Sequence, residues 1–312
     1  MKTSHLQLNC HASVQSRASK DAQQFVPQHT SAPEVQVWFC LTNTMPAKHF
    51  NQLVLMLSQT ERMRLQLLRH ESQRLTYAVA HALVRQVLSR RLHCEADDLS
   101  FCIGQYGKPE LDESPVYEKN NVHFNISHTH SSSQGLVAVV LANVPAGVDV
   151  EQHLVQKPVE MAQMCLTRDE CIRVQKSVEP QKLFRRYWVM KEAIAKAMGI
   201  GLSAPLQSLA IEHSTSERGG WFRVLDGFSP AASQNCWAVR PVDMIHQIGS
   251  PASWDAAVAI AIPKAAPGHH SRFKMPDVSV NWITCEELVS KQGNCPQLQA
   301  TGHLGMDASL RI

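Results

Sequence analysis

The stretch GLVAVVLANVPAGVDVE, residues 135–151, decides the fold because it joins two strands of different character. The apolar run Leu136–Ala142 predicts a strand. The segment Asn143–Gly147 contains proline and glycine and predicts a turn. In the strand that follows, valine and acid alternate, so Asp149 and Glu151 project from the same face while the valines face the core.

Two carboxylates this close repel each other and need a positive partner between them. Alone, the pattern is more often a solvated pair at a sheet edge. The helical segment WVMKEAIAKAMG adds a third acid, Glu192, one turn after Trp188 and one turn before Lys196. Three facing carboxylates would supply oxygen ligands for Mg²⁺, which fills its other positions with water and phosphate oxygens.

The rest of the chain predicts an α+β protein. A strand is expected at Val35–Thr42, and the apolar periodicity of residues 71–92 predicts a helix. A second helix is expected over Leu183–Met198, followed by strands around WFRVL, CWAVR and WDAAVAIAI. Neither a P-loop nor a G-x-G-x-x-G motif is present, which argues against a doubly wound nucleotide-binding fold.

The order strand, helix, strands occurs once in each half and predicts two α+β lobes of similar size. The expected division is an N-terminal extension without stable structure at 1–33, lobes at 34–143 and 144–290, and a loose tail at 291–312.

Composition narrows the function classes. The 312 residues are 44% hydrophobic and 18% charged with a net charge of +3, which is typical of a soluble globular protein and does not indicate nucleic-acid binding. The nine cysteines form no C-x-x-C pair and indicate reduced thiols. No apolar segment resembles a signal peptide or is long enough to span a bilayer. We therefore expect a cytoplasmic protein that binds neither membrane nor nucleic acid.

Two other patterns leave alternatives open. The stretch HFNISHTH, His123–His130, would place His128 and His130 on one strand face as a zinc pair, or pair Ser127 with His128 as nucleophile and base. Ser127 and His128 at a loop edge are better suited to donating hydrogen bonds to a phosphate. Between Glu61 and Arg91, seven arginines stand against two glutamates, either as a solvated helix face or as a cationic rim for a phosphate or an acidic protein.

The motifs YGKP, HFNISHTH, GVDVE and WVMKEAIAK occur in this order along the chain. Their order and separations resemble the signature of the 4′-phosphopantetheinyl transferases, in the large, two-lobed, Sfp-like subgroup. The resemblance runs from about Val35 to Val289. It implies a pseudo-two-fold pair of α+β lobes with coenzyme A bound in the cleft between them.

The resemblance also implies an activity. Such enzymes transfer the phosphopantetheine arm of coenzyme A to a serine of an apo acyl or peptidyl carrier protein and release adenosine 3′,5′-bisphosphate. The carrier would belong to a fatty-acid, polyketide, polyunsaturated-fatty-acid or non-ribosomal-peptide synthase. Since two lobes of one chain could complete the site, we expect a monomer by analogy with the fold.

The resemblance assigns roles to residues by motif position. The expected magnesium ligands are Asp149, Glu151 and Glu192. The expected phosphate and coenzyme A contacts are Lys196, His128, Ser127, Lys108, Arg64 and Arg62, with the two arginines near the 3′-phosphate. For the proton of the carrier serine, Glu192 is the first candidate acceptor, directly or through a magnesium-bound water, and Glu170 is the second.

Two competing functions remain open on the sequence. One is a catalytically silent relative that binds coenzyme A or a carrier protein without transfer. The other is a different magnesium-dependent phosphotransferase that acts on a small nucleotide. The presence of all three acids and Lys196 argues against the first, and the missing P-loop weakens the second.

Overall fold

A computed structural model describes residues 33–42, 45–112, 121–130, 134–212, 220–227, 235–242, 254–263 and 275–290. The expected N-terminal extension, apart from Pro33, and the expected tail at 291–312 lie outside the described residues. Within the described ranges, no helix combines the length and the apolar character that a membrane crossing requires.

The first part of the chain forms strands and helices in the expected order. Its helices are α1 (Ala47–Leu55), α2 (Gln59–Leu67) and α3 (Glu71–Leu92), followed by the 3₁₀ turn η1 (Ala96–Asp98). Its strands are β1 (Val35–Thr42), β2 (Phe101–Ile103), β3 (Pro109–Leu111), β4 (His123–His130) and β5 (Gly135–Ala142). The strand expected at Val35–Thr42 is confirmed.

The second part begins with β6 (Ala146–Glu151). Its helices are α5 (Pro158–Cys165), α6 (Arg168–Lys176) and α7 (Pro180–Met198), followed by the 3₁₀ turns η2 (Gly201–Ser203) and η3 (Leu206–Ser208). The remaining elements are β7 (Leu209–Ile211), β8 (Phe222–Asp226), β9 (Asn235–Val242), β10 (Asp255–Pro263), β11 (Val278–Trp282) and α8 (Cys285–Ser290).

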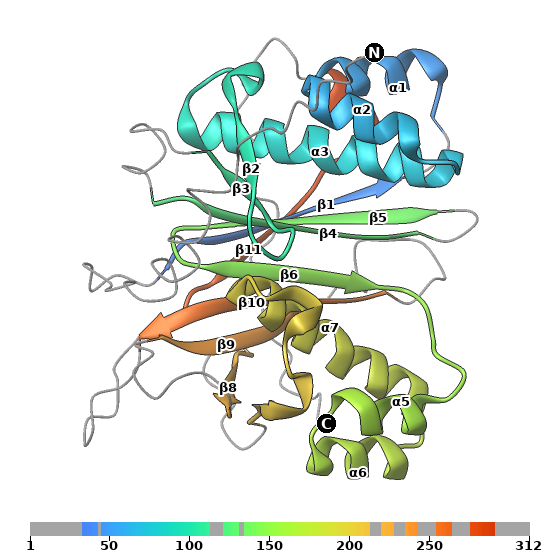
Figure 1. Ribbon diagram of the computed structural model, residues 1–312, viewed down its shortest axis with the longest axis vertical. Helices are drawn as coiled ribbons and strands as arrows, with labels where there is room; N and C mark the ends of the chain where they lie inside the picture. The colour runs from blue at the N-terminus through green and yellow to red at the C-terminus, as the bar shows by residue number, and fades with distance from the viewer. Residues whose placement is uncertain are drawn as a thin grey trace, which may run out of the picture.

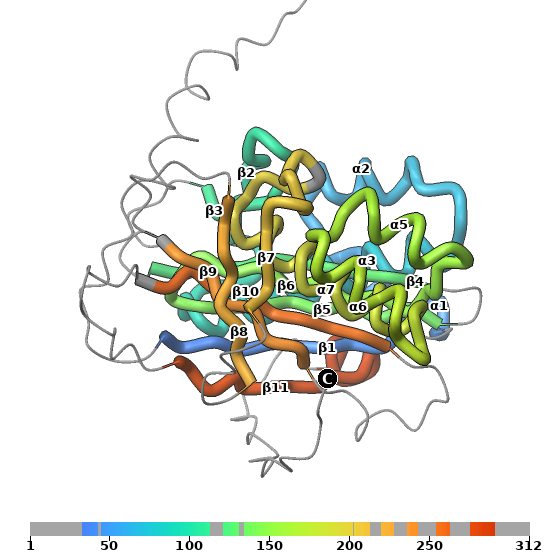
Figure 2. The backbone as a smooth tube through the Cα atoms, turned by 90° about the horizontal axis from the view of Figure 1, so that it is seen from below, coloured from blue at the N-terminus to red at the C-terminus, as the bar shows by residue number. Residues whose placement is uncertain are grey.

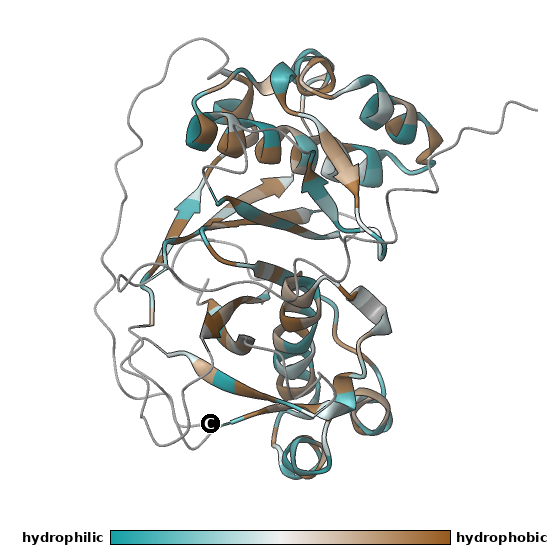
Figure 3. Cartoon of the chain, turned by 60° about the vertical axis from the view of Figure 1, so that its left-hand side comes forward, coloured by the Kyte–Doolittle hydropathy of each residue, from teal (hydrophilic) through white to brown (hydrophobic). Residues whose placement is uncertain are grey.

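The elements form four layers, helices on sheet on sheet on helices, as Figure 1 shows. One apolar core lies between α1–α3 and the first sheet, and a second lies between α5–α7 and the second sheet. A third core fills the space between the two sheets and contains Val148 and Val150. The helices carry alternating hydrophobic and hydrophilic residues, brown and teal in Figure 3, as expected for helices with one buried face. The predicted two-lobed α+β fold is confirmed.

The first sheet has the order β11-β1-β5-β4, and the second has the order β6-β10-β9-β8-β7. Strand β11 pairs parallel with β1, and the two lie side by side in Figure 2. Helix α8 also packs against the first lobe, since Leu288 and Val289 belong to its core. The expected C-terminal lobe at 144–290 therefore differs from the observed arrangement in its last segment, 278–290, which returns to the first sheet.

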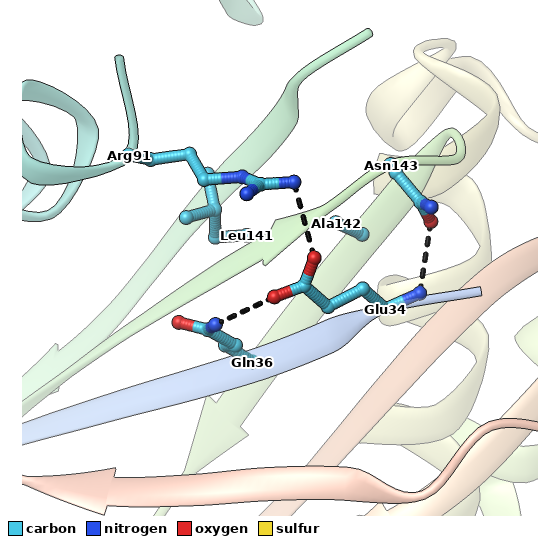
Figure 4. A pocket seen from close by; sticks show the side chains of 6 residues that line it. All are labelled: Glu34, Gln36, Arg91, Leu141, Ala142 and Asn143. Atoms are coloured by element: carbon cyan, nitrogen blue, oxygen red, sulfur yellow. Dashed lines mark hydrogen bonds and ion pairs between the residues drawn. The ribbon is translucent and has the colours of Figure 1, made fainter. Parts of the chain in front are cut away.

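The turn between the lobes is tied to the start of β1 and to the end of α3. The backbone N–H of Glu34 donates to the side-chain oxygen of Asn143 at 2.9 Å. The carboxylate of Glu34 accepts hydrogen bonds from Arg91 at 3.0 Å and from Gln36 at 3.1 Å (Figure 4). At least one arginine of the arginine-rich stretch thus forms an ion pair beside the start of β1.

A glycine lets β6 lie directly on α7. A β-carbon at Gly147 would collide with the backbone of Ala193 and Ala197. Such a close approach of strand to helix requires a residue without a side chain. Helix α7 starts with Pro180 at its first position and ends at Met198, and Gly199 caps it in the left-handed conformation with a φ of 74°. The contact places the last turns of α7 beside the acids of β6.

Candidate active site

The edge strands of the two sheets, β4 and β6, meet along a row of polar contacts. Asn125 accepts a hydrogen bond from the backbone N–H of Val148 at 3.2 Å. Ser127 donates to Asp149 at 2.8 Å, and Thr129 donates to Glu151 at 3.0 Å. Because side chains alternate along a strand, every second residue of β4 faces β6. We call these residues, 125, 127 and 129 of β4 with 148, 149 and 151 of β6, the inter-lobe seam.

Lys196 joins the seam from α7. Its Nζ atom lies 2.6 Å from Oδ1 of Asp149 and 2.9 Å from Oγ of Ser127. Asp149 and Ser127 are buried, while a quarter of the Lys196 side-chain surface remains exposed. Lys196 therefore supplies a positive partner for Asp149.

Glu192 lies one turn before Lys196 and is also buried. Its Oε1 atom has no hydrogen-bond partner among the described residues. Burial raises the pKa of Glu192, and the negative charge of Asp149 raises it further, while Lys196 opposes the shift. A buried carboxylate oxygen without a partner is costly in free energy, so this atom is suited to accept a proton or a cation.

Glu151 has a different environment. Its Oε1 atom accepts from Thr129, from the backbone N–H of Gln152 at 2.7 Å and from that of His153 at 2.9 Å. Within the described ranges, no three His, Cys, Asp or Glu side chains are close enough together to hold a metal ion. The donor types nevertheless suit Mg²⁺, and the unpartnered oxygen of Glu192 beside Asp149 could accept a cation or a proton.

His128 follows Ser127 on β4 but is exposed, while Ser127 is buried in the seam. The hydroxyl of Ser127 is bonded to Asp149 and Lys196, so it forms no nucleophile–base pair with His128. The protein around the His128 ring reduces its hydration, and the positive charge of Lys196 disfavours a positive charge on the ring. Both effects lower the pKa of His128 below its usual range.

Glu170 does not join this cluster. It closes a capping box with Thr167 at the start of α6, forms a 2.6 Å ion pair with Lys191 and accepts from the backbone N–H of Ile211 at 3.2 Å. Both Glu170 and Lys191 are buried. With both carboxylate oxygens already bonded to protein donors, the geometry gives Glu170 a structural role in the second lobe.

The remaining predicted contacts lie in the first lobe. Lys108 sits in the turn between β2 and β3, and its charge acts on His123, whose pKa is lowered to about 4 mainly by burial. Arg62 and Arg64 are exposed on α2. The charge of Arg64 acts on Tyr77, which lies in the second turn of α3.

One ionic cluster was missed at the sequence level. Glu61 accepts from Nδ1 of His81 at 2.9 Å and from Nε of Arg85 at 2.9 Å, and it closes a capping box with Ser58. The signal was present: Ser58-x-x-Glu61 is a capping-box sequence, and His81 and Arg85 are one turn apart on one face of α3.

Comparison with known families agrees with this arrangement. Residues 145–259 match the model of the 4′-phosphopantetheinyl transferase superfamily, and residues 44–143 match the N-terminal 4′-phosphopantetheinyl transferase family. The two matches meet at the turn before β6 and together cover more than two thirds of the chain. The chain belongs to the 4′-phosphopantetheinyl transferase superfamily.

The individual proteins that the chain resembles carry the name of the same family. The chain is 33% identical over 133 residues to the 4′-phosphopantetheinyl transferase Sfp of Bacillus subtilis, a match that covers 41% of this chain and 54% of Sfp. It is 29% identical over 182 residues to a putative 4′-phosphopantetheinyl transferase of Synechocystis, covering 57% of this chain and 70% of that protein. The chain thus spans about half the length of the first curated relatives that it matches.

Proposed function

We propose that this protein transfers the 4′-phosphopantetheine group of coenzyme A to a serine of an apo acyl or peptidyl carrier protein and releases adenosine 3′,5′-bisphosphate. The observation that carries the proposal is the inter-lobe seam, where Lys196, Asp149 and Ser127 bond to one another beside the unpartnered oxygen of Glu192. Membership in the family supports the same reaction class.

Asp149 and Glu192 would hold a magnesium ion, with Glu151 as the third expected ligand on the same face of β6. When bound, the ion would neutralise negative charge on the phosphate oxygens. Lys196 adds a positive group between the lobes, and its bond to Asp149 keeps the ammonium oriented in the absence of substrate. His128 is a further hydrogen-bond donor at the exposed side of β4.

The carrier serine must lose its proton when its oxygen forms the new bond to phosphorus. Glu192 is the acceptor that we favour, directly or through a magnesium-bound water, because its carboxylate lies in the site beside Asp149 and Lys196. The oxygens of Glu170 are bonded within the second lobe, so we assign it no proton transfer. A second proton acceptor is not required for this step.

The substrate and the setting are part of the proposal. We propose that the protein acts as a monomer, because the residues of the seam and α7 all come from one chain. We also propose that it acts in the cytoplasm. The partner is a carrier protein of a fatty-acid, polyketide, polyunsaturated-fatty-acid or non-ribosomal-peptide synthase. Tests should therefore include carriers from each synthase type.

The experiment mixes the protein with coenzyme A, magnesium chloride and one of several apo carrier proteins, and weighs the carrier by mass spectrometry. We expect a mass gain of one phosphopantetheine on at least one carrier, and none when its serine is replaced by alanine. Binding of coenzyme A without a mass gain on any carrier would indicate a catalytically silent relative. Neither binding nor transfer would leave a different phosphotransferase as the better hypothesis.

A further inference from the structure

Two cysteines from distant parts of the chain meet where the last described segment joins the first sheet. The sulfur of Cys40, on β1, lies 3.7 Å from the sulfur of Cys285, the first residue of α8. The two residues are 245 positions apart in the sequence. Both are thiols in the structure. A bond between the sulfurs would be about 2.05 Å long, so they would need to approach by less than about 2 Å.

The backbone brings the two cysteines together. Strand β11 pairs in parallel with β1, and directly after β11 the N–H of Ile283 donates to the carbonyl oxygen of Phe39 at 3.0 Å. Cys40 is the residue after Phe39, and Cys285 comes two residues after Ile283. Cys40 belongs to the core of the first lobe, and Cys285 packs against that core. The contact between the sulfurs is therefore built into the pairing of the two strands.

The surroundings of the two thiols differ. The thiol of Cys285 donates to the carbonyl oxygen of Leu41 at 3.2 Å, and the sulfur of Cys40 lies 3.7 Å from the same oxygen. The hydrogen bond with Cys285 and burial raise the pKa of the Cys40 thiol well above its usual range. Cys40 has no exposed surface, whereas Cys285 is only partly buried. A reagent from solvent therefore reaches Cys285 first, with the protonated Cys40 directly behind it.

We propose that Cys40 and Cys285 form a reversible disulfide that fastens the segment 278–290 to β1. The oxidant is a small-molecule disulfide such as oxidised glutathione. The thiolate of Cys285 attacks one sulfur of the oxidant, which forms a mixed disulfide and releases one thiol. Cys40 then loses its proton, and its sulfur attacks the sulfur of Cys285 and displaces the second thiol. Two protein thiols are oxidised, one disulfide is reduced to two thiols, and the two protons pass to the released thiols.

The cross-link acts on a segment that the first lobe acquires from the far end of the described chain. Segment 278–290 supplies the outer strand of the first sheet and part of its core, but it follows the strands of the second sheet in sequence. A disulfide between residues so far apart restricts the unfolded chain and thereby stabilises the folded one. The oxidised protein should therefore keep this segment on the first lobe under conditions that release it from the reduced protein.

The test incubates the full-length protein with mixtures of oxidised and reduced glutathione, blocks the remaining thiols with iodoacetamide and digests with trypsin without reduction. Cleavage after lysine places Cys40 in the peptide 21–48 and Cys285 in the peptide 275–291, and neither peptide contains another cysteine. Mass spectrometry should detect the two peptides joined, with the loss of two hydrogens. The joined species should increase with the proportion of oxidised glutathione and disappear after dithiothreitol.

Melting temperature measures the effect on stability. The variants are Cys285→Ser and Cys40→Ala, each of which removes one of the two sulfurs, and serine at position 285 keeps a donor for Leu41. Cys171→Ser, at a partly buried cysteine of α6, is the matched control. Oxidation should raise the melting temperature of the wild type and of the control by roughly 5–10 °C, and should leave that of the two variants unchanged.

Three results would overturn the inference. The first is a folded protein whose Cys285 peptide is recovered only in alkylated or glutathione-bound form at every glutathione ratio. The second is a Cys40 peptide joined to a cysteine other than Cys285. The third is a joined peptide without any rise in the melting temperature, which would show that the bond does not fasten the segment. Because the reaction needs neither coenzyme A nor a carrier protein, its outcome is independent of the proposed function.

Discussion

The ammonium group of Lys196 lies 2.6 Å from the carboxylate of Asp149 and 2.9 Å from the hydroxyl of Ser127, so one cation bonds to side chains from both sheets. Asp149 belongs to the edge of the second sheet, and Ser127 to the edge of the first. This contact explains how a buried carboxylate is tolerated beside the buried Glu192. The same contact makes the roles of the individual acids testable.

Asp149→Ala should lower the transfer rate by at least about hundredfold, the typical loss when one preorganised electrostatic contact is removed. The variant leaves Lys196 without its anion and removes one expected magnesium ligand. The measurement is the initial rate of carrier modification over a series of magnesium concentrations. Asp97→Asn, at an exposed aspartate of the first lobe, is the control. Wild-type rates and magnesium dependence in Asp149→Ala would show that the acids are misassigned.

Glu192→Gln should raise stability while it lowers activity. Because burial and Asp149 raise the pKa of Glu192, ionisation above the unfolded value of 4.5 opposes folding, and the wild type loses stability as pH rises through the raised pKa. Without magnesium, we expect the variant to melt a few degrees higher than the wild type at pH 8, with no difference at pH 4. The transfer rate should fall by about 10²–10⁴-fold.

The matched control for this comparison is Glu160→Gln, at an exposed glutamate of α5. It should change neither the melting temperature nor the transfer rate, because exposed ion pairs contribute little. A Glu192→Gln protein that melts below the wild type at pH 8 would contradict the inference that burial and the charge of Asp149 make the ionised Glu192 destabilising.

Glu170→Gln should reduce stability but not the chemistry of the folded enzyme. The change leaves the fully buried Lys191 without its anion, and breaking a buried ion pair costs about 3–5 kcal/mol. The double variant Glu170→Gln/Lys191→Met should recover much of that loss. Unfolding in urea measures the stability, and kcat is compared at a temperature where each variant is folded. A large fall in kcat with unchanged stability would instead make Glu170 a catalytic base.

Gly147→Ala should separate β6 from α7. The new methyl group would meet the backbone of Ala193 and Ala197, which cannot move as a flexible side chain could, and overpacking typically costs about 1–3 kcal/mol or more. We expect a lower melting temperature together with a lower transfer rate, because Asp149 shifts relative to Lys196.

The comparison for this glycine is Gly199→Ala. A β-carbon there meets no atom within 4 Å, but the φ of 74° strains an alanine. This variant should lose stability through strain at the end of α7, with little effect on the rate. Equal rates in both alanine variants would show that the contact between β6 and α7 does not set the geometry of the seam.

The alternation of valine and acid in β6 was enough to predict which residues face the core and which face the site. Val148 and Val150 are buried between the sheets, while Asp149 meets Ser127 and Lys196. The helix carrying Glu192 was also predictable, because its apolar spacing and its terminal glycine are local signals. These features depend on neighbours within a few residues along the chain.

Other features depend on contacts that no local pattern specifies. The segment around β11 is short and half-buried, so its sequence does not indicate that it pairs with β1. Glu170 has the sequence position of a catalytic candidate, but its bonds to Lys191 and Ile211 give it a structural role. The spacing Thr167-x-x-Glu170 was a local signal for that role, just as Ser58-x-x-Glu61 was for Glu61.

The parallel pairing of β11 with β1 has a consequence for biosynthesis. The first sheet receives its outer strand only after the entire second lobe has been translated. Translation of residues 43–277, between β1 and β11, takes roughly ten to fifty seconds at about 5–20 residues per second. During that interval the nascent chain presents β1 as an open edge that could pair with other chains. Chaperone protection of the ribosome-bound chain would therefore matter most before residue 278 emerges.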